Sequence, residues 1–440
     1  MILGLKNYLD RLVPRRHPIR LFYHKTLAAL AAIYYGFPAS QMTVIAVTGT
    51  KGKSTTANMI HAVLSEAGKS VGMLTTVNFK IGAVETANVS EQTTLSPFPL
   101  QRMLKKMRAA GCEIIVLEVT SHAIVQSRIW GVNIDTAVFT NLASEHLDYH
   151  GDFEEYRNAK GIIFKNLNPS PRKAGVAKIS IVNADDPEHA YFESFQADQQ
   201  FAYGIQNGAY NARNLEQRPN GTKFLLKIPN GEVNIDLKIP GRMNVYNALA
   251  AAAVGVAFHV NLETVKKALD NMPPVPGRIE IIDSGQPFTV VVDFAHTPDS
   301  LEQVLSMFKD ITKGRIITVF GACGDRDTNN RPVMGGVLDK FSDIMILTDD
   351  DPHTEDHKAI AEMVRKGINR KEGDGFWQVL DRVEAIRLAI SSAKEGDAVL
   401  IFGKGAQEYQ FLNHKKIPHD DRKVAREILS RAVAVDLPKL

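Results

Sequence analysis

Cysteine and tryptophan are scarce in this 440-residue sequence, which has two of each. Cys112 and Cys323 lie in apolar or glycine-rich contexts without metal-ligand spacing, and this excludes a disulfide framework and a cysteine metal site. A strong charge is also lacking, because the formal net charge is only +3, so we expect no nucleic-acid partner. Reduced, buried thiols are typical of a cytoplasmic protein, and we expect that location.

The sequence contains no apolar run long enough to span a bilayer. The longest run, residues 27–35, follows a basic N-terminal stretch and has no small-residue cleavage site. We expect residues 1–40 to form a short helical segment whose amphipathic helix covers a neighbouring domain. A helix that lies on a membrane surface is the alternative interpretation.

The most informative motif that is present is TVIAVTGTKGKSTT, residues 43–56. A β-branched run breaks into a glycine loop framed by Gly49 and Gly52, and a helical pattern follows. Backbone N–H groups of such a loop and the positive end of its helix bind phosphate oxygens. Lys53 supplies charge for the β- and γ-phosphates, and Ser54 supplies a hydroxyl for Mg²⁺. The first glycine of the usual pattern is replaced, but the stretch still predicts a nucleoside triphosphate site.

Alternating strand and helix patterns set the expected organisation. Apolar β-rich runs separated by helical patterns predict a doubly wound, mostly parallel sheet, with strands at 43–47, 71–75, 114–119, 135–140 and 178–183. Short alternating runs with Asn-Gly turns in 200–240 predict a small antiparallel insertion. The proline-rich cluster at 273–277 predicts a linker, and a C-terminal Rossmann-like α/β domain follows it. We expect a central ATP-binding domain at 41–276 and the C-terminal domain at 277–440.

Other strand ends in the first part carry ionisable residues. Glu118 ends the run 114–119, where open α/β sheets bind ligands, and we expect it to bind Mg²⁺ unless it is a solvated strand-end glutamate. His146 and Asp148 follow the next strand and are candidates to approach a metal or phosphate, although each is also a normal loop-capping residue. Lys160 lies on the following predicted helix, where a lone lysine is normally solvated.

Nine sequence blocks between Thr43 and Arg422 resemble the Mur ligase family, in the family's order. Within that family the resemblance is to the type that adds the third amino acid to UDP-N-acetylmuramoyl-L-alanyl-D-glutamate. The blocks are TGTKGKSTT, LEVTSHAIVQSR, TNLASEHLDYHGDFEEYRNAK, GRMNVYNALAA, PPVPGRIE, VVDFAHTPDSL, VFGACGDRDTNNRPVMG, TDDDPHTED and GKGAQEYQ.

The resemblance implies a catalytic set and an ATP site with two Mg²⁺ ions. The implied catalytic residues are Lys53, Glu118, His146, Lys160 and His296, and Lys160 matches a lysine that is carbamylated in the family. The implied metal ligands are Ser54, Glu118, His146 and carbamylated Lys160. The implied ATP contacts are Gly49, Thr50, Lys51, Gly52, Lys53, Ser54, Thr55, Asn244, Asn247, Arg278 and Asp293.

The resemblance also implies sites for the acceptor and for the incoming amino acid. The muramoyl-dipeptide contacts are Thr93, Thr94, Ser121, Gln126 and Arg128. The amino-acid contacts are Asp350, Asp351, His353, Gly403 and Gln407. The expected reaction transfers the γ-phosphoryl group to the acceptor carboxylate, and the amine then attacks the acyl phosphate to form an amide.

Two departures from the family pattern affect the substrates. Only about 40 residues precede the loop strand, where the family carries a domain that grips the uridine diphosphate, so we expect weak UDP binding or another form of muramoyl peptide. Diaminopimelate-adding members carry Asp-Asn-Pro-Arg where this chain has Asp350-Asp351-Pro352-His353, and Gln407 replaces a glutamate. A pocket with an extra acid and no arginine would suit L-lysine or ornithine better than meso-diaminopimelate.

Alternatives to this function remain open at the level of sequence. One is a related ligase with another acceptor, of the folylpolyglutamate or cyanophycin type. The other is a non-catalytic nucleotide-binding partner subunit. The expected partners are small molecules, namely muramoyl dipeptide, amino acid and ATP. We expect the protein to be a monomer.

Overall fold

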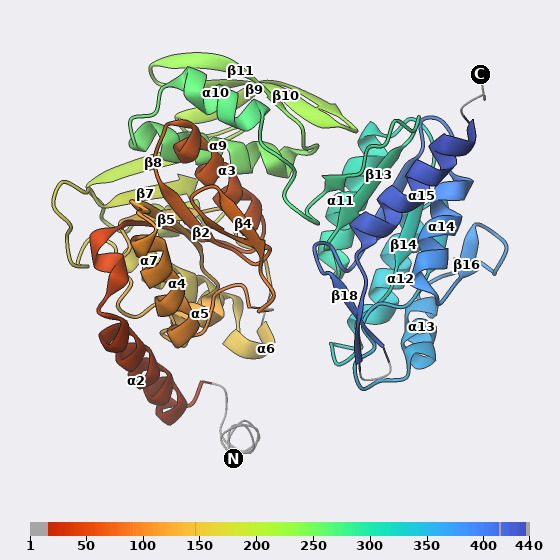
Figure 1. The fold of residues 1–440 in the computed structure, drawn as a ribbon, viewed down its shortest axis with the longest axis horizontal. Coiled ribbons are helices and arrows are strands. Elements are labelled where there is room, and N and C mark those ends of the chain that lie inside the picture. Colours follow the sequence, from red (N-terminus) through yellow and green to blue (C-terminus); the bar gives the residue numbers. More distant parts are fainter. Residues whose placement is uncertain (1–15, 91, 146, 413–414, 437–440) are drawn as a thin grey trace. The chain divides into compact units, whose positions relative to one another are not determined.

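The computed structural model describes residues 16–90, 92–145, 147–412 and 415–436. The chain forms two compact units (Figure 1). The first comprises Met1–Glu216, Lys223–Leu237 and Arg242–Met272, and the second comprises Gln217–Thr222, Lys238–Gly241 and Pro273–Leu440.

An 11-stranded sheet forms the centre of the first unit, with the order β11-β10-β9-β8-β7-β6-β1-β5-β2-β3-β4. Strand β1 lies between β5 and β6 and is parallel to both, so the carboxyl ends of these three strands meet at one edge. The strand bounds are β1 Thr43–Thr48, β2 Val71–Leu74, β3 Asn78–Ile81, β4 Val84–Ala87, β5 Ile114–Glu118, β6 Thr136–Phe139, β7 Ile179–Asn183, β8 Gln199–Gly204, β9 Tyr210–Arg218, β10 Gly221–Ile228 and β11 Gly231–Leu237.

Helices cover this sheet because its strands are apolar on both faces. Alternate residues of a strand point to opposite faces, and Val44 and Ala46 of β1 share a core with residues of α4, α7 and α8. Helices α3 and α9 pack together and against other strands of the sheet. The helix bounds are α2 Pro18–Tyr35, the 3₁₀ helix η1 Pro38–Gln41, α3 Lys53–Glu66, α4 Pro97–Ala109, α5 Ser121–Val125, α6 Leu147–His150, α7 Phe153–Lys165, α8 His189–Glu193, α9 Arg242–Ala257 and α10 Leu262–Asp270.

A six-stranded sheet of order β12-β13-β17-β14-β15-β16 forms the second unit. All of its pairs are parallel except β12 with β13. The strands are β12 Glu280–Ile281, β13 Thr289–Asp293, β14 Ile316–Phe320, β15 Ile344–Leu347, β16 Phe376–Gln378 and β17 Ala398–Phe402, and β18 Tyr409–Leu412 pairs separately with β19 Lys415–Pro418. The helices are α11 Pro298–Ile311, α12 Asn330–Phe341, α13 His357–Arg365, α14 Arg382–Ser392 and α15 Asp421–Asp436.

The predicted fold class is confirmed: a mostly parallel central sheet with an antiparallel part, and a parallel α/β unit after the linker. The predicted antiparallel insertion is formed by β9, β10 and β11, which continue the central sheet. One detail was missed. The antiparallel strands β3 and β4 were not predicted, and they turn at Gly82, whose φ of 57° favours glycine.

Candidate active site

The glycine loop connects β1 to α3 at the edge where β1, β5 and β6 end. Gly49 and Gly52 have positive φ angles of 149° and 81°, a region that glycine adopts without strain. A Cβ atom on Gly49 would lie 1.9 Å from Thr140 Oγ1, and one on Gly52 would lie 2.4 Å from Asn247 Oδ1. Both glycines are therefore required for the loop to approach its neighbours. The loop leads into the N-terminus of α3, where backbone N–H groups can bind an anion such as a phosphate.

Three side chains at this edge supply the charge and oxygen ligands that a metal-bound triphosphate needs. Lys53 Nζ donates to the carbonyl oxygens of Gly49 and Thr50, at 3.1 and 2.7 Å. Ser54 Oγ donates to Glu118 Oε2 at 2.8 Å, and both side chains are buried. The backbone N–H of Thr76 donates to the same carboxylate oxygen at 2.8 Å. The predicted neighbours Lys53, Ser54 and Glu118 thus lie at one place.

Lys160 is buried on α7 and reaches the same loop. Its Nζ donates to the carbonyl oxygen of Gly49 at 2.7 Å and lies 4.4 Å from the centre of the Tyr156 ring. Burial lowers the pKa of Lys160 well below its usual value, and the nearby Lys53 cation lowers it further. The interpretation of Lys160 as a solvated surface group is therefore wrong, because its side chain is buried.

The loop is fixed by residues that the sequence analysis did not select. Thr140 and Asn141 follow β6, and both side chains donate to the carbonyl oxygen of Lys51, at 2.8 and 3.0 Å. The N–H of Thr50 donates to the carbonyl of Asn141 at 2.8 Å, and the N–H of Lys51 donates to its side-chain oxygen at 2.9 Å. The signal in the sequence was the polar pair directly after a buried strand, at an edge already expected to bind ligand.

The predicted adenine-side residues lie close to the loop but bond to one another. Asn247 accepts a hydrogen bond from Thr56 Oγ1 at 3.0 Å and donates to Asn244 at 3.1 Å. Both asparagines are buried on α9, and Thr55 is buried on the first turn of α3. Their arrangement supports the loop from behind, and contact with adenine stays a prediction.

Three of the five predicted acceptor residues, Thr94, Gln126 and Arg128, form a connected group beside Glu118. Arg128 donates to Gln126 Oε1 at 2.9 and 2.7 Å and to the carbonyl oxygen of Thr94 at 2.9 Å. Thr94 donates to the carbonyl oxygen of Glu118 at 3.1 Å. The remaining two have other partners, since Thr93 Oγ1 accepts from Thr76 and Ser121 Oγ lies 2.9 Å from His150 Nε2.

The strand ends of the second unit hold the other predicted residues. Asp293 ends β13 and accepts backbone hydrogen bonds from Ile279 and Ala295, both at 2.8 Å. Burial raises the pKa of Asp293, although the neighbouring Arg278 opposes the shift. The Arg278 guanidinium lies 4.6 Å from the Phe294 ring, and His296 is exposed beyond it with Nδ1 2.9 Å from the Phe294 carbonyl oxygen.

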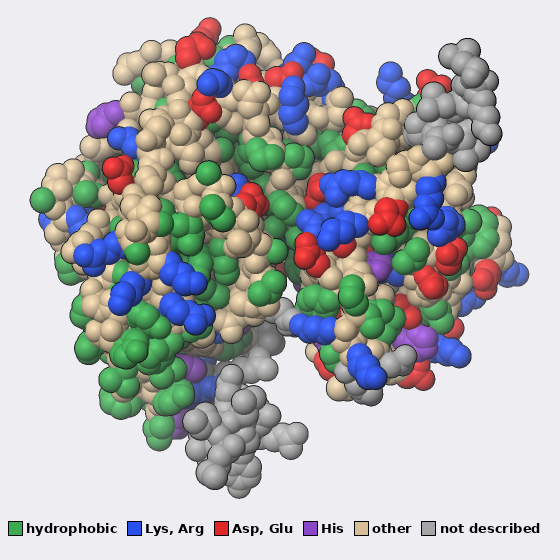
Figure 2. Space-filling view, in the orientation of Figure 1, with side chains coloured by type: hydrophobic (Ala, Val, Ile, Leu, Met, Phe, Trp, Pro, Cys, Tyr) green, Lys and Arg blue, Asp and Glu red, His purple; other side chains and the backbone are tan. Residues whose placement is uncertain are grey.

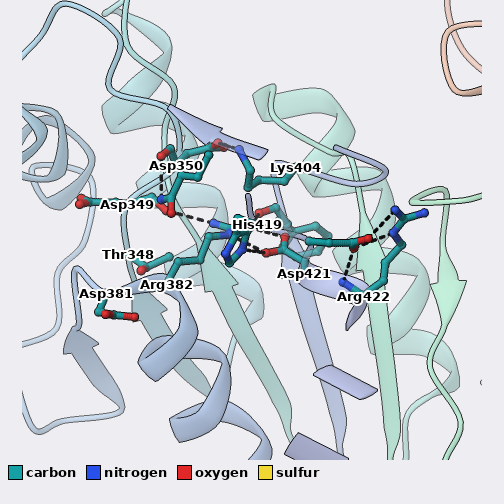
Figure 3. A network of polar contacts seen from close by, with 12 residues as sticks. Thr348, Asp349, Asp350, Asp381, Arg382, Lys404, His419, Asp421 and Arg422 are labelled. Carbon is teal, nitrogen blue, oxygen red and sulfur yellow. Dashed lines mark hydrogen bonds and ion pairs between the residues drawn. The ribbon is translucent and has the colours of Figure 1, made fainter. Parts of the chain in front are cut away.

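A buried lysine balances the aspartates after β15 (Figure 3). Lys404 is fully buried, and its Nζ lies 2.8 Å from Asp351 Oδ1 and 3.3 Å from Asp350 Oδ1. Asp351 Oδ1 also accepts from the N–H of Phe411 at 2.7 Å. The sequence argument treated Asp351 as an extra acid for the substrate, but one of its oxygens is used inside the protein, and Lys404 was not selected.

Three further residues complete this edge. A Cβ atom on Gly403, with φ of 108°, would lie 2.5 Å from Asp350 Oδ2, so glycine is required for this close approach. His353 has a φ of 52°, and its ring lies 4.9 Å from that of Phe411. The N–H of Gln407 donates to the carbonyl of Lys404 at 3.0 Å, and the side chain is half-buried.

Arg326 was also missed by the sequence analysis, although it lies in a glycine turn after β14. Burial, with Asp350 and Asp351, raises the pKa of Cys323 to about 12, and Arg326 opposes that shift. Arg326 is exposed, and it is near enough to Cys323 to oppose the effect of the two aspartates on the pKa of that thiol.

The donor set at the glycine loop fits Mg²⁺. Ser54 and Glu118 offer hard oxygen ligands next to each other, and Mg²⁺ in phosphate sites needs only one or two protein ligands. Across the residues that the structure describes, no three His, Cys, Asp or Glu side chains converge on a point, which argues against an all-protein metal cage there. The predicted ligand His146 and the side chain of Asp148 lie outside the described residues.

Comparison with known proteins places both units in one family. Residues 47–255 match the family described as Mur ligase middle domain, and residues 277–405 match the Mur ligase, glutamate ligase domain. A UDP-N-acetylmuramoyl-L-alanyl-D-glutamate--2,6-diaminopimelate ligase of Geobacillus thermodenitrificans is 42% identical over 404 residues, which cover 91% of this chain and 82% of that protein. A UDP-N-acetylmuramyl-tripeptide synthetase of Roseiflexus sp. is 38% identical, covering 92% and 82%.

Solved structures give the same result. A structure of a UDP-N-acetylmuramoyl-L-alanyl-D-glutamate--2,6-diaminopimelate ligase has a TM-score of 0.65 at 30% identity and covers 89% of this chain and 79% of that one. A folylpolyglutamate synthase of Mycobacterium tuberculosis in complex with ADP has a TM-score of 0.68 and covers 99% of both chains. Its identity is only 18%, so this second likeness concerns the fold alone.

Proposed function

The chain belongs to the Mur ligase family of ATP-dependent ligases, and we propose that it adds a diamino acid to a UDP-N-acetylmuramoyl-L-alanyl-D-glutamate-type acceptor in peptidoglycan synthesis. The observation that carries the proposal is the cluster at the glycine loop, where Lys53, Lys160 and the Ser54–Glu118 pair converge within hydrogen-bond distance of one another or of the loop carbonyls. We propose residues 41–276 as the ATP-binding domain and 277–440 as the C-terminal domain.

The reaction must overcome the poor reactivity of a carboxylate. Its negative charge repels an amine, and it carries no good leaving group. Transfer of the γ-phosphoryl group from ATP to a carboxylate oxygen gives an acyl phosphate and ADP. The amine then attacks the acyl carbon, and phosphate leaves with the electron pair of the C–O bond as the amide forms.

The residues at the glycine loop serve the first step. Backbone N–H groups at the start of α3 bind the phosphates, and Lys53 neutralises charge on the group in transfer. Ser54 and Glu118 would hold Mg²⁺, which would supply positive charge to neutralise the phosphates. Arg128 and Gln126 would orient the acceptor carboxylate near the glycine loop. Arg128 bonds to Gln126 and Thr94, and Thr94 bonds to the carbonyl oxygen of Glu118 at the end of β5.

Lys160 takes a second role in this proposal. In its deprotonated form this amine would add to carbon dioxide with loss of one proton, and the resulting carbamate anion would offer oxygen ligands for a second Mg²⁺. The support is the lowered pKa, caused first by burial, together with the position of Nζ at the Gly49 carbonyl. Intact-mass measurement in bicarbonate tests it, because the mass increment of one carbon dioxide should disappear in Lys160→Ala.

The second unit would hold the incoming amino acid. Arg326 would offer a cation for the α-carboxylate, and Asp350 and Asp351, which flank the buried Lys404, would offer carboxylate oxygens for a distal ammonium group. His353 lacks the bidentate fork that a distal carboxylate would need. We therefore favour L-lysine or ornithine over meso-diaminopimelate as the third amino acid.

The test is a ligation assay with ATP, Mg²⁺, UDP-muramoyl dipeptide and single amino acids, followed by mass spectrometry of the product. We expect phosphate release only when acceptor and amino acid are both present, with L-lysine or ornithine preferred. Preference for diaminopimelate would overturn the amino-acid assignment alone. Phosphate release with a folate or an aspartate polymer, but not with the muramoyl dipeptide, would overturn the acceptor.

A further inference from the structure

Helix α2 directs its large apolar side chains away from the rest of the first unit. Its buried residues are small: Ala28, Ala31 and Ala32 are each exposed by 1% or less. The opposite face, named here the α2 stripe, consists of Ile19, Phe22, Tyr23, Leu30, Ile33 and Tyr34, which are between 54% and 74% exposed. The spacing of three, four and seven residues places all six on one side of the helix.

Aromatic rings extend this apolar surface beyond the helix. The Tyr34 ring lies 6.3 Å from that of Phe98 on α4, and the Phe37 ring lies 6.1 Å from that of Trp130. Phe37, Phe98 and Trp130 are each just over one third exposed. A single exposed apolar residue needs no explanation, but a contiguous patch of this kind marks an interaction surface.

A basic helix, α4, contacts the stripe through Phe98, whose ring lies near that of Tyr34. Helix α2 packs against α4, and Lys105 Nζ of α4 lies 5.9 Å from the Tyr35 ring. The exposed cations of α4 are Arg102, Lys105, Lys106 and Arg108. Helices α2 and α4 together carry six Lys and Arg residues and no Asp or Glu, in a chain whose net charge is only +3. Figure 2 shows hydrophobic side chains gathered over α2 and Lys and Arg side chains over α4.

We propose that the α2 stripe docks the first unit on an anionic membrane surface. The apolar and aromatic side chains would enter the boundary between headgroups and acyl chains, and the cations of α4 would lie over lipid phosphates. No helix among the described residues is long and apolar enough to cross a membrane, so the attachment is peripheral. This surface is separate from the glycine loop and does not depend on the proposed function.

A second copy of the chain fits the same surface less well. A symmetric dimer through the stripe would place the same patch on both subunits. The cations of both α4 helices would then face each other at the rim, and no acid of α2 or α4 would offset them. An anionic surface neutralises these charges instead.

The test measures binding of the full chain to vesicles by co-sedimentation. Vesicles with phosphatidylglycerol in phosphatidylcholine should bind the protein, pure phosphatidylcholine should bind it far more weakly, and high salt should reduce binding to the anionic vesicles. The double variant Phe22→Glu/Ile33→Glu should lose at least tenfold in affinity. Its matched control is Val84→Glu/Val333→Glu, which alters apolar residues of similar exposure elsewhere, 66% and 52%, and should bind as the wild type does.

A second variant pair separates charge from apolar contact. Lys105→Gln/Lys106→Gln should weaken binding to anionic vesicles roughly tenfold and reduce its salt dependence. Ligation of soluble substrates should be unchanged in every variant, which shows that each is folded and keeps this test apart from the proposed function. Absence of vesicle binding, or equal binding by the stripe variant, overturns the proposal. A dimer without lipid that the stripe variant abolishes assigns the surface to a second copy and also overturns it.

Discussion

Both units carry their candidate residues where parallel strands end, but the two edges treat charge in different ways. At the edge of β1, β5 and β6, Lys53 and Lys160 point at backbone carbonyl oxygens, and the carboxylate Glu118 is bonded to a hydroxyl and an N–H. At the edge of β13, β14, β15 and β17, a buried lysine lies between two aspartates. The lysines of the first edge therefore bond to backbone carbonyl oxygens of the glycine loop, whereas the lysine of the second edge is paired with two carboxylates inside the protein. Lysines near the ends of parallel strands thus take different partners in the two units.

The strongest way to break this comparison is to remove the internal cation of the second edge. Lys404→Met should leave Asp350 and Asp351 buried without their main countercharge and destabilise the second unit by about 3–5 kcal/mol. Urea unfolding followed by Trp377 fluorescence in a Trp130→Phe background measures this unit, because the chain has only these two tryptophans. The control Lys340→Met breaks an exposed pair with Glu302 and should cost under about 1 kcal/mol. Equal unfolding of both variants would show that Lys404 does not balance the aspartates.

At the first edge the cation should matter for catalysis and little for stability. Lys53→Met should lower kcat by roughly 10²–10³-fold, since one preorganised charge is lost from the phosphoryl-transfer step. Phosphate release under saturating substrates measures the effect, and unfolding should remain near the wild-type value. Lys69→Met changes an exposed lysine beyond the same helix and should retain full turnover. A Lys53 variant within tenfold of wild type would contradict the proposed role.

The free energies of unfolding of the two units should depend differently on pH in acid. Burial, with help from Lys80, lowers the pKa of His61 to about 4 from 6.5. The unfolded state therefore binds more protons between these values, and the free energy of unfolding of the first unit should fall by about 2–3 kcal/mol as pH drops from 6.5 to 4. His61→Gln should flatten this dependence, measured by Trp130 fluorescence in a Trp377→Phe background.

The second unit should respond differently over the same range. Burial raises the pKa of Asp421, but Arg382 and His419 together hold it well below its usual range. The contribution of this carboxylate is present above its unfolded pKa, about 4, and is lost only as pH falls through the lower folded value. A second unit that lost stability through Asp421 already at pH 5–6 would contradict this difference.

The smallest expected effect concerns Asp351. Asp351→Asn keeps an oxygen for Lys404 and for the N–H of Phe411 but removes one negative charge. We expect about 1–2 kcal/mol of destabilisation, a severalfold higher KM for L-lysine and an unchanged KM for ATP. Asp374→Asn, at an exposed position in the same unit, is the control and should change none of these. An unchanged KM for L-lysine would remove Asp351 from amino-acid selection.

Much of the fold was predictable because the strands are buried and apolar. The predicted runs at 43–47, 114–119 and 178–183 correspond to β1, β5 and β7, and the proline cluster lies where the second unit resumes. The antiparallel strands β3 and β4 were missed, because β4 is exposed along its length and carries no strong alternation. The outward direction of the α2 stripe was missed for another reason: the helix has apolar residues on all sides, so its pattern does not tell which side packs.

The site residues that could be predicted are those whose positions follow from the glycine loop and from the ends of parallel strands. Lys53, Ser54 and Glu118 follow from the loop and strand ends, and the structure brings them together. Lys160 was placed at the site only by the family resemblance, and Lys404 was not selected, because an isolated lysine in a helix or loop gives no sign of burial. Arg326 and Asn141 were overlooked since single polar residues in turns are common. Their roles depend on partners far away in the sequence.

The central claim is that the acceptor carboxylate is activated as an acyl phosphate. The most direct measurement uses acceptor whose D-glutamate carboxylates carry oxygen-18, with ATP, Mg²⁺ and L-lysine, and mass analysis of the released phosphate. The account predicts one labelled oxygen in each phosphate, because the acyl C–O bond is the one that breaks. Phosphate that is released in step with ligation and carries no label would contradict it.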